Sequence, residues 1–220
     1  MLYDLSQPIF NNVPQWPKHK PTSLTVPHLI PVEAANVERV ELTTHTGTHI
    51  DAPYHFFPEM ETIDQLPLDH FHGPCSAVDL RHKQAGSGII PEDFSSLPAH
   101  DAKGAIVLLK TGWGDKRALS EEFLTAWPYL TGEGASYLVS LGIHGVGIEG
   151  LSVGGYNDPE KEQASHRVLL GNRKFIVEDI RVPEPLLDGR LRHFAAFPIL
   201  ISGAGGAWAR AIAWDEGDIS

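Results

Sequence analysis

The sequence predicts a single domain of mixed α/β (α+β) class, built around a strand-rich sheet. Short β-branched or apolar runs end at glycine or proline along most of the chain, and only three segments carry helix signals. The composition, 42% hydrophobic and 20% charged over 220 residues, is typical of a globular domain with one substantial core. Because no linker, repeat or low-complexity run divides the sequence, the predicted domain spans residues 1–220.

Eight segments are predicted as strands: residues 2–5, 37–46, 77–80, 105–110, 143–148, 174–177, 197–201 and 207–214. The runs at 104–109 and 145–148 are continuously apolar, without clear alternation. This pattern is typical of strands that are covered on both faces. We therefore expect a sheet with a further layer on each side.

Three helices are predicted from their ends. Ser120 precedes two glutamates, the pattern of an N-cap with an acidic first turn. Gly142 follows the segment 135–141 as a C′ glycine does, and Pro91 begins a weaker helix over 91–97. Residues 11–31 contain five prolines and no period, so we predict an irregular arm there, near the functional site.

Composition also excludes several functions. The chain has 17 basic and 28 acidic residues, a net charge of −11, and no Lys/Arg block, which argues against nucleic acid as a partner. The most apolar stretch, 195–214, is interrupted by Pro198 and three glycines, which argues against a membrane span. The N-terminus lacks the pattern of a secretory signal, so the cytoplasm is the expected location. Since Cys75 is the only cysteine, a metal site must use nitrogen and oxygen ligands.

Five of the 12 histidines fall between His45 and His72, and in the densest part His45, His49, Asp51 and His55 lie within eleven residues. Two imidazoles, a carboxylate and a further imidazole form a mixed N/O donor set that suits Zn²⁺, Mn²⁺ or Co²⁺. A straight strand would hold the Cα atoms of His45 and His49 about 13 Å apart, too far for one ion. A helix would align these histidines but rotate Asp51 away. We therefore predict that a strand delivers His45 and that the chain bends near Gly47, whose missing side chain leaves space for an ion.

The segment resembles the signature His-x-Gly-Thr-His-x-Asp-x-Pro-x-His of the bacterial kynurenine formamidase and cyclase family, with every fixed position matched. The resemblance implies that His45 and His49 bind a first metal, that Asp51 bridges two metals, and that His55 donates and accepts protons. It also implies a layered, swivelling β/β/α domain and a homo-oligomer, a dimer or a tetramer.

The family pattern also asks for a distant histidine followed twelve residues later by a glutamate, and the chain supplies His166 and Glu178. The resemblance implies that both bind metal, where a helix passes into a strand. It further implies that Trp16 lies against the substrate. The segment 149–155 and the single histidine before Arg167 depart from the usual family pattern, so the substrate wall differs. His144 and His193 lie in or beside apolar runs and are interpreted as core histidines.

These residues lead to a functional hypothesis of metal-dependent hydrolysis of a small aryl formamide or cyclic amide. One or two divalent ions, Zn²⁺ or alternatively Mn²⁺, would activate water as a bound hydroxide and polarise the carbonyl, while His55 hands a proton to the leaving nitrogen. Ring opening of an isatin-like lactam, or a cyclase or dehydratase reaction, could use the same metal site. A non-enzymatic metal- or ligand-binding protein is a further alternative, against which the presence of His55 argues.

Overall fold

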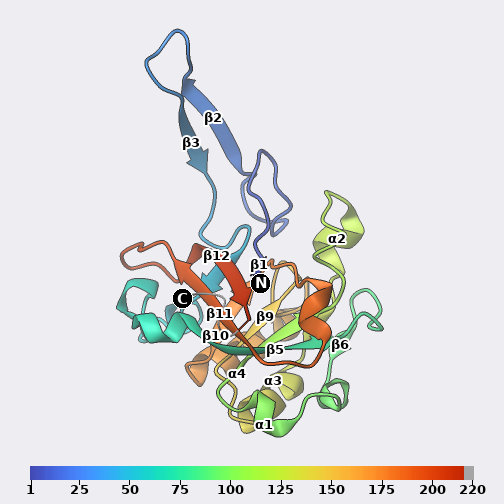
Figure 1. Ribbon diagram of the computed structural model, residues 1–220. Coiled ribbons are helices and arrows are strands. Elements are labelled where there is room, and N and C mark those ends of the chain that lie inside the picture. Colours follow the sequence, from blue (N-terminus) through green and yellow to red (C-terminus); the bar gives the residue numbers. More distant parts are fainter. Residues whose placement is uncertain (216–220) are drawn as a thin grey trace.

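The central feature of the structure is a sheet that closes on itself, with helices packed against one side (Figure 1). The computed structural model describes residues 1–215, so the last five residues of the predicted domain, 216–220, lie outside the described part. The sheet contains eight strands: β1 (Leu2–Asp4), β4 (His49–Asp51), β5 (His72–Asp79), β7 (Ile106–Lys110), β9 (Gly145–Ile148), β10 (Phe175–Glu178), β11 (Arg192–Pro198) and β12 (Gly206–Trp214).

The strand order is β1-β12-β11-β5-β7-β9-β10-β4, and β4 also pairs with β12. This last pairing closes the sheet into a barrel-like core. Strands β5, β7, β9 and β10 run parallel, whereas β4, β11, β12 and β1 pair antiparallel. Strand β4 therefore lies between the ends of the parallel and antiparallel parts.

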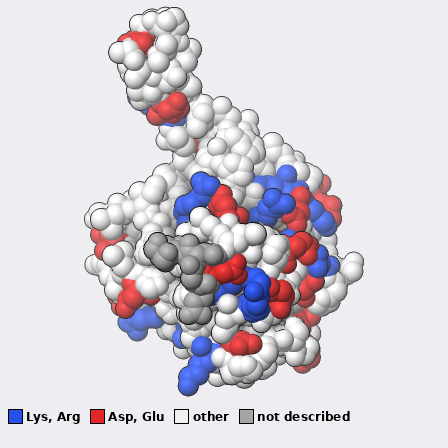
Figure 2. Space-filling view, viewed as in Figure 1, with Lys and Arg blue, Asp and Glu red and all other residues white. Residues whose placement is uncertain are grey.

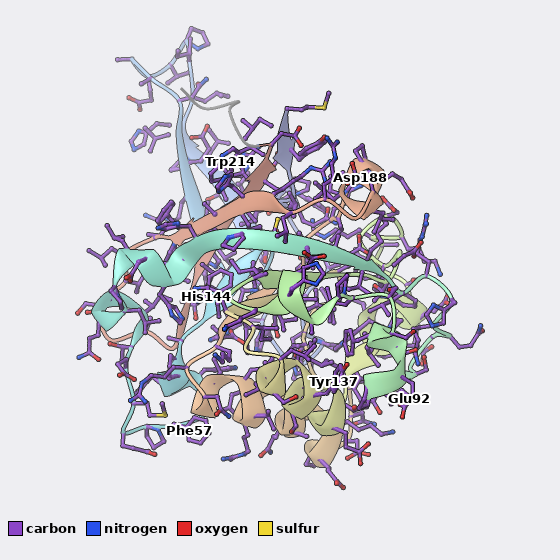
Figure 3. The ribbon with its side chains drawn as sticks, turned by 60° about the horizontal axis from the view of Figure 1, so that its bottom comes forward. Phe57, Glu92, Tyr137, His144, Asp188 and Trp214 are labelled. Carbon is purple, nitrogen blue, oxygen red and sulfur yellow. The ribbon has the colours of Figure 1, made fainter. Side chains whose placement is uncertain are left out.

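The described helices are α1 (Ala99–Ala102), α2 (Glu121–Thr125), α3 (Gly132–Ser140) and α4 (Pro159–Gly171). In Figure 3 the helical layer, marked by Tyr137 on α3, lies below the sheet. Side chains of β7 alternate between two cores: Ile106 and Leu108 face the barrel interior, while Val107 and Leu109 pack toward the helices. The predicted mixed, strand-rich fold with both faces covered is confirmed.

Local helix signals were partly correct. Ser120 caps α2 by accepting a hydrogen bond from the Phe123 N–H at 3.2 Å. Helix α3 starts three residues before the predicted segment because Thr131 caps it, and it ends before Gly142, whose φ is +78°. The segment predicted at 91–97 forms only a 3₁₀ turn, Pro91–Phe94.

Strand boundaries needed more correction. The strand predicted at 197–201 is wrong for most of its length, since β11 covers Arg192–Pro198 and pairs with both β12 and β5. Proline lacks an N–H for the sheet ladder, and β11 ends at Pro198. Strand β5 begins at His72, five residues before the predicted start, and the strand expected over 37–46 ends at Glu41.

The predicted irregular arm is also corrected, because residues 23–28 form β2 (Ser23–His28), which pairs antiparallel with β3 (Val37–Glu41). The resulting hairpin projects from the barrel (Figure 1), and its surface is mostly uncharged (Figure 2). Its exposed apolar side chains are Val26, Leu29, Ile30, Val32, Val37 and Val40. The preceding segment, 11–22, is irregular as predicted and remains against the body. A second small pair joins β6 (Gly88–Ile89) to β8 (Tyr129–Leu130).

The two histidines interpreted as core residues differ. His144 is half-buried and bonds through Nε2 to the His70 carbonyl at 2.9 Å. His193 is exposed on β11 and stacks on Trp214, so that interpretation is wrong. Among the described residues, no helix combines the length and apolarity needed to cross a bilayer.

His70 makes stability depend on pH. Burial, assisted by His144, lowers its pKa from 6.5 to about 4, so the unfolded chain binds this proton first as the pH falls. The resulting loss of folding stability is absent above pH 7 and grows as the pH falls from about 6.5 to about 4. Substituting His70→Gln should recover about 1–2 kcal/mol of the stability that the wild type loses between pH 8 and pH 5. Urea unfolding at both pH values measures this difference, and an equal loss in the two proteins would contradict it.

Candidate metal centre

The histidine motif forms a turn followed by a strand and a second turn. Strand β4 carries His49 and Asp51, whose side chains point to the same face because they are two residues apart. Pro53 then begins a 3₁₀ turn, Pro53–His55, that ends with His55. His45 lies in the turn before β4, so its predicted place on a strand is wrong.

The predicted bend at Gly47 is confirmed, since its φ is +72°. We also expected the missing side chain of Gly47 to leave space for an ion, and this part of the prediction is wrong. A Cβ at Gly47 would lie 3.1 Å from the Ile9 side chain. The space is therefore filled by protein. A different glycine makes room at the site: a Cβ on Gly206 of β12 would lie 2.6 Å from Cε1 of His45.

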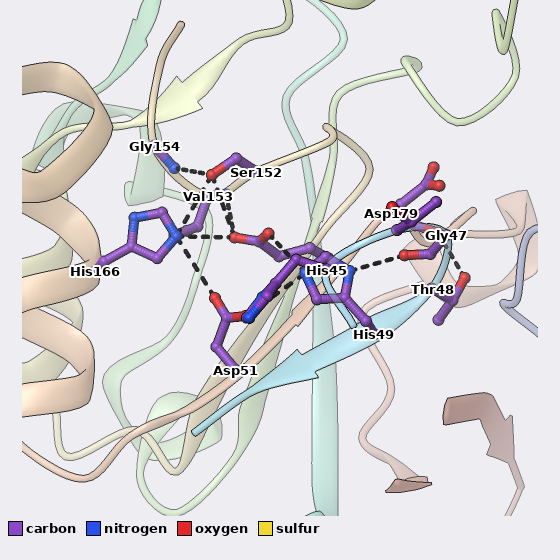
Figure 4. Close-up of polar contacts among 12 residues, drawn as sticks. His45, Gly47, Thr48, His49, Asp51, Ser152, Val153, Gly154, His166 and Asp179 are labelled. Carbon is purple, nitrogen blue, oxygen red and sulfur yellow. Dashed lines mark hydrogen bonds and ion pairs between the residues drawn. The ribbon is translucent and has the colours of Figure 1, made fainter. Parts of the chain in front are cut away.

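Two neighbouring elements complete the cluster (Figure 4). Glu178 of β10 is the register partner of His49 on β4, and both side chains face the same side. His166 comes from α4, which begins where the Asp158 carboxylate accepts the Glu160 N–H at 3.0 Å. The hydroxyl of Thr48 donates to the carbonyl of Asp179 at 2.6 Å and thereby ties the motif to the end of β10.

The five predicted metal ligands lie together. His45 Nδ1 lies 2.8 Å from Asp51 Oδ1, and His49 Nε2 lies 3.5 Å from the same oxygen and 3.3 Å from Glu178 Oε2. His166 Nε2 lies 3.5 Å from Asp51 Oδ2 and 3.1 Å from Glu178 Oε1. These contacts define two overlapping groups that share Asp51, one with His45 and His49 and one with His166 and Glu178.

The donor atoms suit a divalent metal. His49 and His166 each direct Nδ1 at a backbone carbonyl, of Gly47 at 2.8 Å and of Glu162 at 2.7 Å. This arrangement favours the tautomer with a free Nε2 lone pair facing the carboxylates. Among the described residues, His49 Nε2 and Asp51 Oδ2 are buried without a hydrogen-bond partner. Buried polar atoms without partners are costly, and a cation would satisfy both.

The electrostatics of the cluster follow from opposed effects. Burial acts to raise the pKa of Asp51, but the positive forms of His55 and His45 hold it well below its usual value. Burial acts to lower the pKa of His49, yet Asp51 and Glu178 raise it well above 6.5. The carboxylates of the cluster therefore stay negatively charged and stabilise positive charge beside them, as the ligands of a metal cation must.

The cluster opens into a cavity of about 260 Å³. His55 lines it and stacks on His45 with ring centroids 3.9 Å apart. Burial lowers the pKa of His55 to about 4, so its ring is neutral near pH 7. Among the described residues, no group hydrogen-bonds its side chain. Trp16 also lines this cavity, and its ring centroid lies 5.2 Å from that of Tyr156 and 5.7 Å from that of Trp127.

Of the remaining cavity residues, Leu151 and Ser152 lie in the segment 149–155 that was expected to form the substrate wall. Sequence reasoning did not assign the others, which are His19, Phe56, Glu162 and Gln163. One signal was present. Asp158 followed by Pro159 is an N-cap with proline at the first helical position, which predicts a helix start. A helix from that point places Glu162 one turn before His166, on the same face.

The fold and the site together define an α/β protein with a barrel-like core and a buried His/Asp/Glu cluster that could hold a divalent metal. Residues 3–154 match the Cyclase family, described as “Putative cyclase”. The kynurenine formamidase of Bacillus cereus is 30% identical over 210 residues, which is 95% of each chain. The chain therefore belongs to the cyclase family and is a hydrolase.

Solved structures agree with this assignment. One described as “Potential Metal-Dependent Hydrolase With Cyclase Activity” matches with a TM-score of 0.78 and 28% identity, covering 98% of both chains. Isatin hydrolase A from Labrenzia aggregata matches with a TM-score of 0.86, covering 97% of this chain and 93% of its own. Because its identity is 20%, this second likeness concerns the fold alone.

Proposed function

We propose that the chain hydrolyses the carbon–nitrogen bond of a small aryl formamide or cyclic amide, as its kynurenine formamidase relatives do by name. The observation that carries this proposal is the pairing of a buried His/Asp/Glu cluster with an adjacent, unpaired His55 in an aromatic-walled cavity. Hydrolysis of an amide needs an activated water, a polarised carbonyl and a proton for the leaving nitrogen. The site offers residues for each requirement.

The metal would be held by His45, His49 and Asp51, with a second ion held by Asp51, His166 and Glu178; Zn²⁺ is the proposed metal and Mn²⁺ the alternative. A divalent ion bound there would lower the pKa of a coordinated water toward neutrality and polarise the substrate carbonyl. The Nδ1 bonds to the carbonyls of Gly47 and Glu162 orient His49 and His166 for this role.

His55 is proposed to move the proton. Its neutral ring accepts a proton from the attacking water and then donates it to the nitrogen of the breaking bond. Stacking on His45 keeps this ring beside the metal centre without occupying its nitrogens. Trp16 would pack on the aryl ring of the substrate, and Tyr156 and Trp127 hold it in place.

The second group of ligands has its own test. Substituting His166→Ala or Glu178→Ala should lower the number of metal ions bound per chain, because each side chain belongs to one group only. Elemental analysis after metal loading and desalting measures the stoichiometry. The ion held by His45, His49 and Asp51 should persist, and an unchanged stoichiometry would remove both residues from the ligand set.

A spectrophotometric panel tests the reaction. The protein loaded with Zn²⁺ or Mn²⁺ is assayed on N-formylkynurenine, isatin and simple aryl formamides. Turnover of formamides supports the proposal, whereas turnover of isatin alone favours lactam ring opening. No turnover on any substrate would favour a binding protein or a cyclase or dehydratase reaction.

We also propose that the chain forms a cytoplasmic homo-oligomer, a dimer or a tetramer. The exposed apolar side chains of the β2–β3 hairpin support this, because a two-stranded hairpin is marginally stable in water unless it is packed against something. Multi-angle light scattering on the full chain measures the mass, and a monomer at micromolar concentration would contradict the proposal. The proposed partners are small-molecule substrates, and neither nucleic acid nor a membrane is proposed as a partner.

A further inference from the structure

The cavity carries an acidic group that the proposed chemistry does not use. Glu162 of α4 lines the cavity, and among the described residues it is the only carboxylate there outside the metal cluster. No lysine or arginine of the described residues lines the same space. The other polar side chains outside the cluster and His55 are His19, Ser152 and Gln163, none of which is a permanent cation.

The position of Glu162 is fixed by two bonds. Its Oε1 accepts the Asn157 N–H at 3.0 Å, and its carbonyl accepts from His166 Nδ1 at 2.7 Å. The second carboxylate oxygen, Oε2, has no partner among the described residues. Four residues of α-helix separate Glu162 from His166, a rise of about 6 Å. Glu162 therefore lies one helical turn before the proposed ligand His166, and both side chains line the same cavity.

Aromatic side chains border this part of the cavity. Trp16 and Phe56 both line it, and aromatic faces attract cations. Helix α4 carries two basic side chains, Lys161 and Arg167, and both are exposed. Lys161 Nζ lies 3.7 Å from Asp158 Oδ2 and 6.0 Å from the ring centroid of Tyr129. Arg167 lies over the rings of Phe56 and Phe57 at 5.9 and 5.7 Å. Its Nε is bonded to Gln163 at 3.2 Å. Neither Lys161 nor Arg167 lines the cavity itself, and among the described residues neither forms an ion pair with Glu162.

We propose that Glu162 forms an ammonium-binding subsite, so that the preferred substrates are small aryl amides that carry a primary ammonium group away from the scissile bond. The carboxylate would receive the ammonium while the amide reaches the metal centre and the aryl ring packs between Trp16 and Phe56. The cavity offers no matching cation to a substrate carboxylate. This inference rests on the proposed function for the position of the amide.

Binding of product analogues to the metal-loaded protein tests the subsite. Isothermal titration compares 2-(aminomethyl)aniline with 2-ethylaniline, which replaces the ammonium by a methyl group. The wild type should bind the ammonium compound about tenfold more tightly, the effect of a partly buried ion pair. In Glu162→Gln the two affinities should become equal, because glutamine keeps the oxygen that accepts from Asn157 but loses the charge.

Glu160→Gln is the matched control, since Glu160 lies two residues earlier on α4 and does not line this cavity. It should keep the tenfold preference, and elemental analysis should show equal metal content in all three proteins. Equal binding of the two compounds by the wild type, a preference that persists in Glu162→Gln, or no binding of either compound overturns the subsite. Failure of the formamide assay with the preference intact would instead reject the proposed reaction and leave the subsite standing.

Discussion

Substituting Asp51→Asn is expected to reduce bound metal to near zero and turnover about a thousandfold. Asp51 is the only residue that belongs to both ligand groups, and its carboxylate lies within 3.5 Å of three histidine nitrogens. Asparagine keeps the shape and one acceptor oxygen but removes the negative charge. Since metal activation supplies several kcal/mol of transition-state stabilisation, its loss corresponds to about three orders of magnitude in rate.

The measurements are elemental analysis and turnover on the best formamide of the panel. Asp69→Asn, at an exposed position, controls for the loss of one acidic residue from the chain. Circular dichroism should show an unchanged fold, because Asp51 is held in β4 by strand pairing on both sides. A fully metal-loaded Asp51→Asn protein would contradict the shared-ligand arrangement.

The spacing of the motif predicted the site better than it predicted the local structure. On a straight strand, His45 and His49 would lie too far apart to bind one ion, so the spacing required a bend. The structure has this bend at Gly47. The prediction placed the wrong histidine on the strand, because β4 carries His49 whereas His45 lies in the turn before it. That choice depends on β4 pairing with β10 and β12, a long-range contact that no local pattern shows.

Other features of the site also depended on the tertiary structure. Glu178 faces His49 because two strands distant in sequence are in register, and only the family pattern anticipated it. Strand β2 was hidden in a proline-rich segment because its hydrogen bonds come from Val37–Glu41. Residue 206 must be a glycine because a Cβ there would lie 2.6 Å from Cε1 of His45, which is more than 150 residues away in the sequence. Continuous apolar runs in the sequence identified the buried strands β7 and β9, because this apolar character does not depend on which strands they pair with.

Substituting His55→Ala is expected to reduce turnover a hundredfold or more while the metal content stays unchanged. His55 is separate from the two ligand groups, so its loss removes proton transfer without removing a metal ligand. A positioned acid–base group contributes about 10²–10⁴ in rate. His55→Gln is the companion variant, because glutamine fills more of the space beside His45 and still cannot shuttle a proton at neutral pH.

The two variants separate proton transfer from support of the metal centre. If His55 acts only by packing on His45, the alanine variant should lose metal and the glutamine variant should recover both metal and turnover. If it moves the proton, both variants should keep metal, both should remain slow, and substrates with better leaving groups should be affected less, since they need less protonation of nitrogen. Exposed His72→Gln controls for removal of a histidine, and normal turnover in His55→Ala would reject the role.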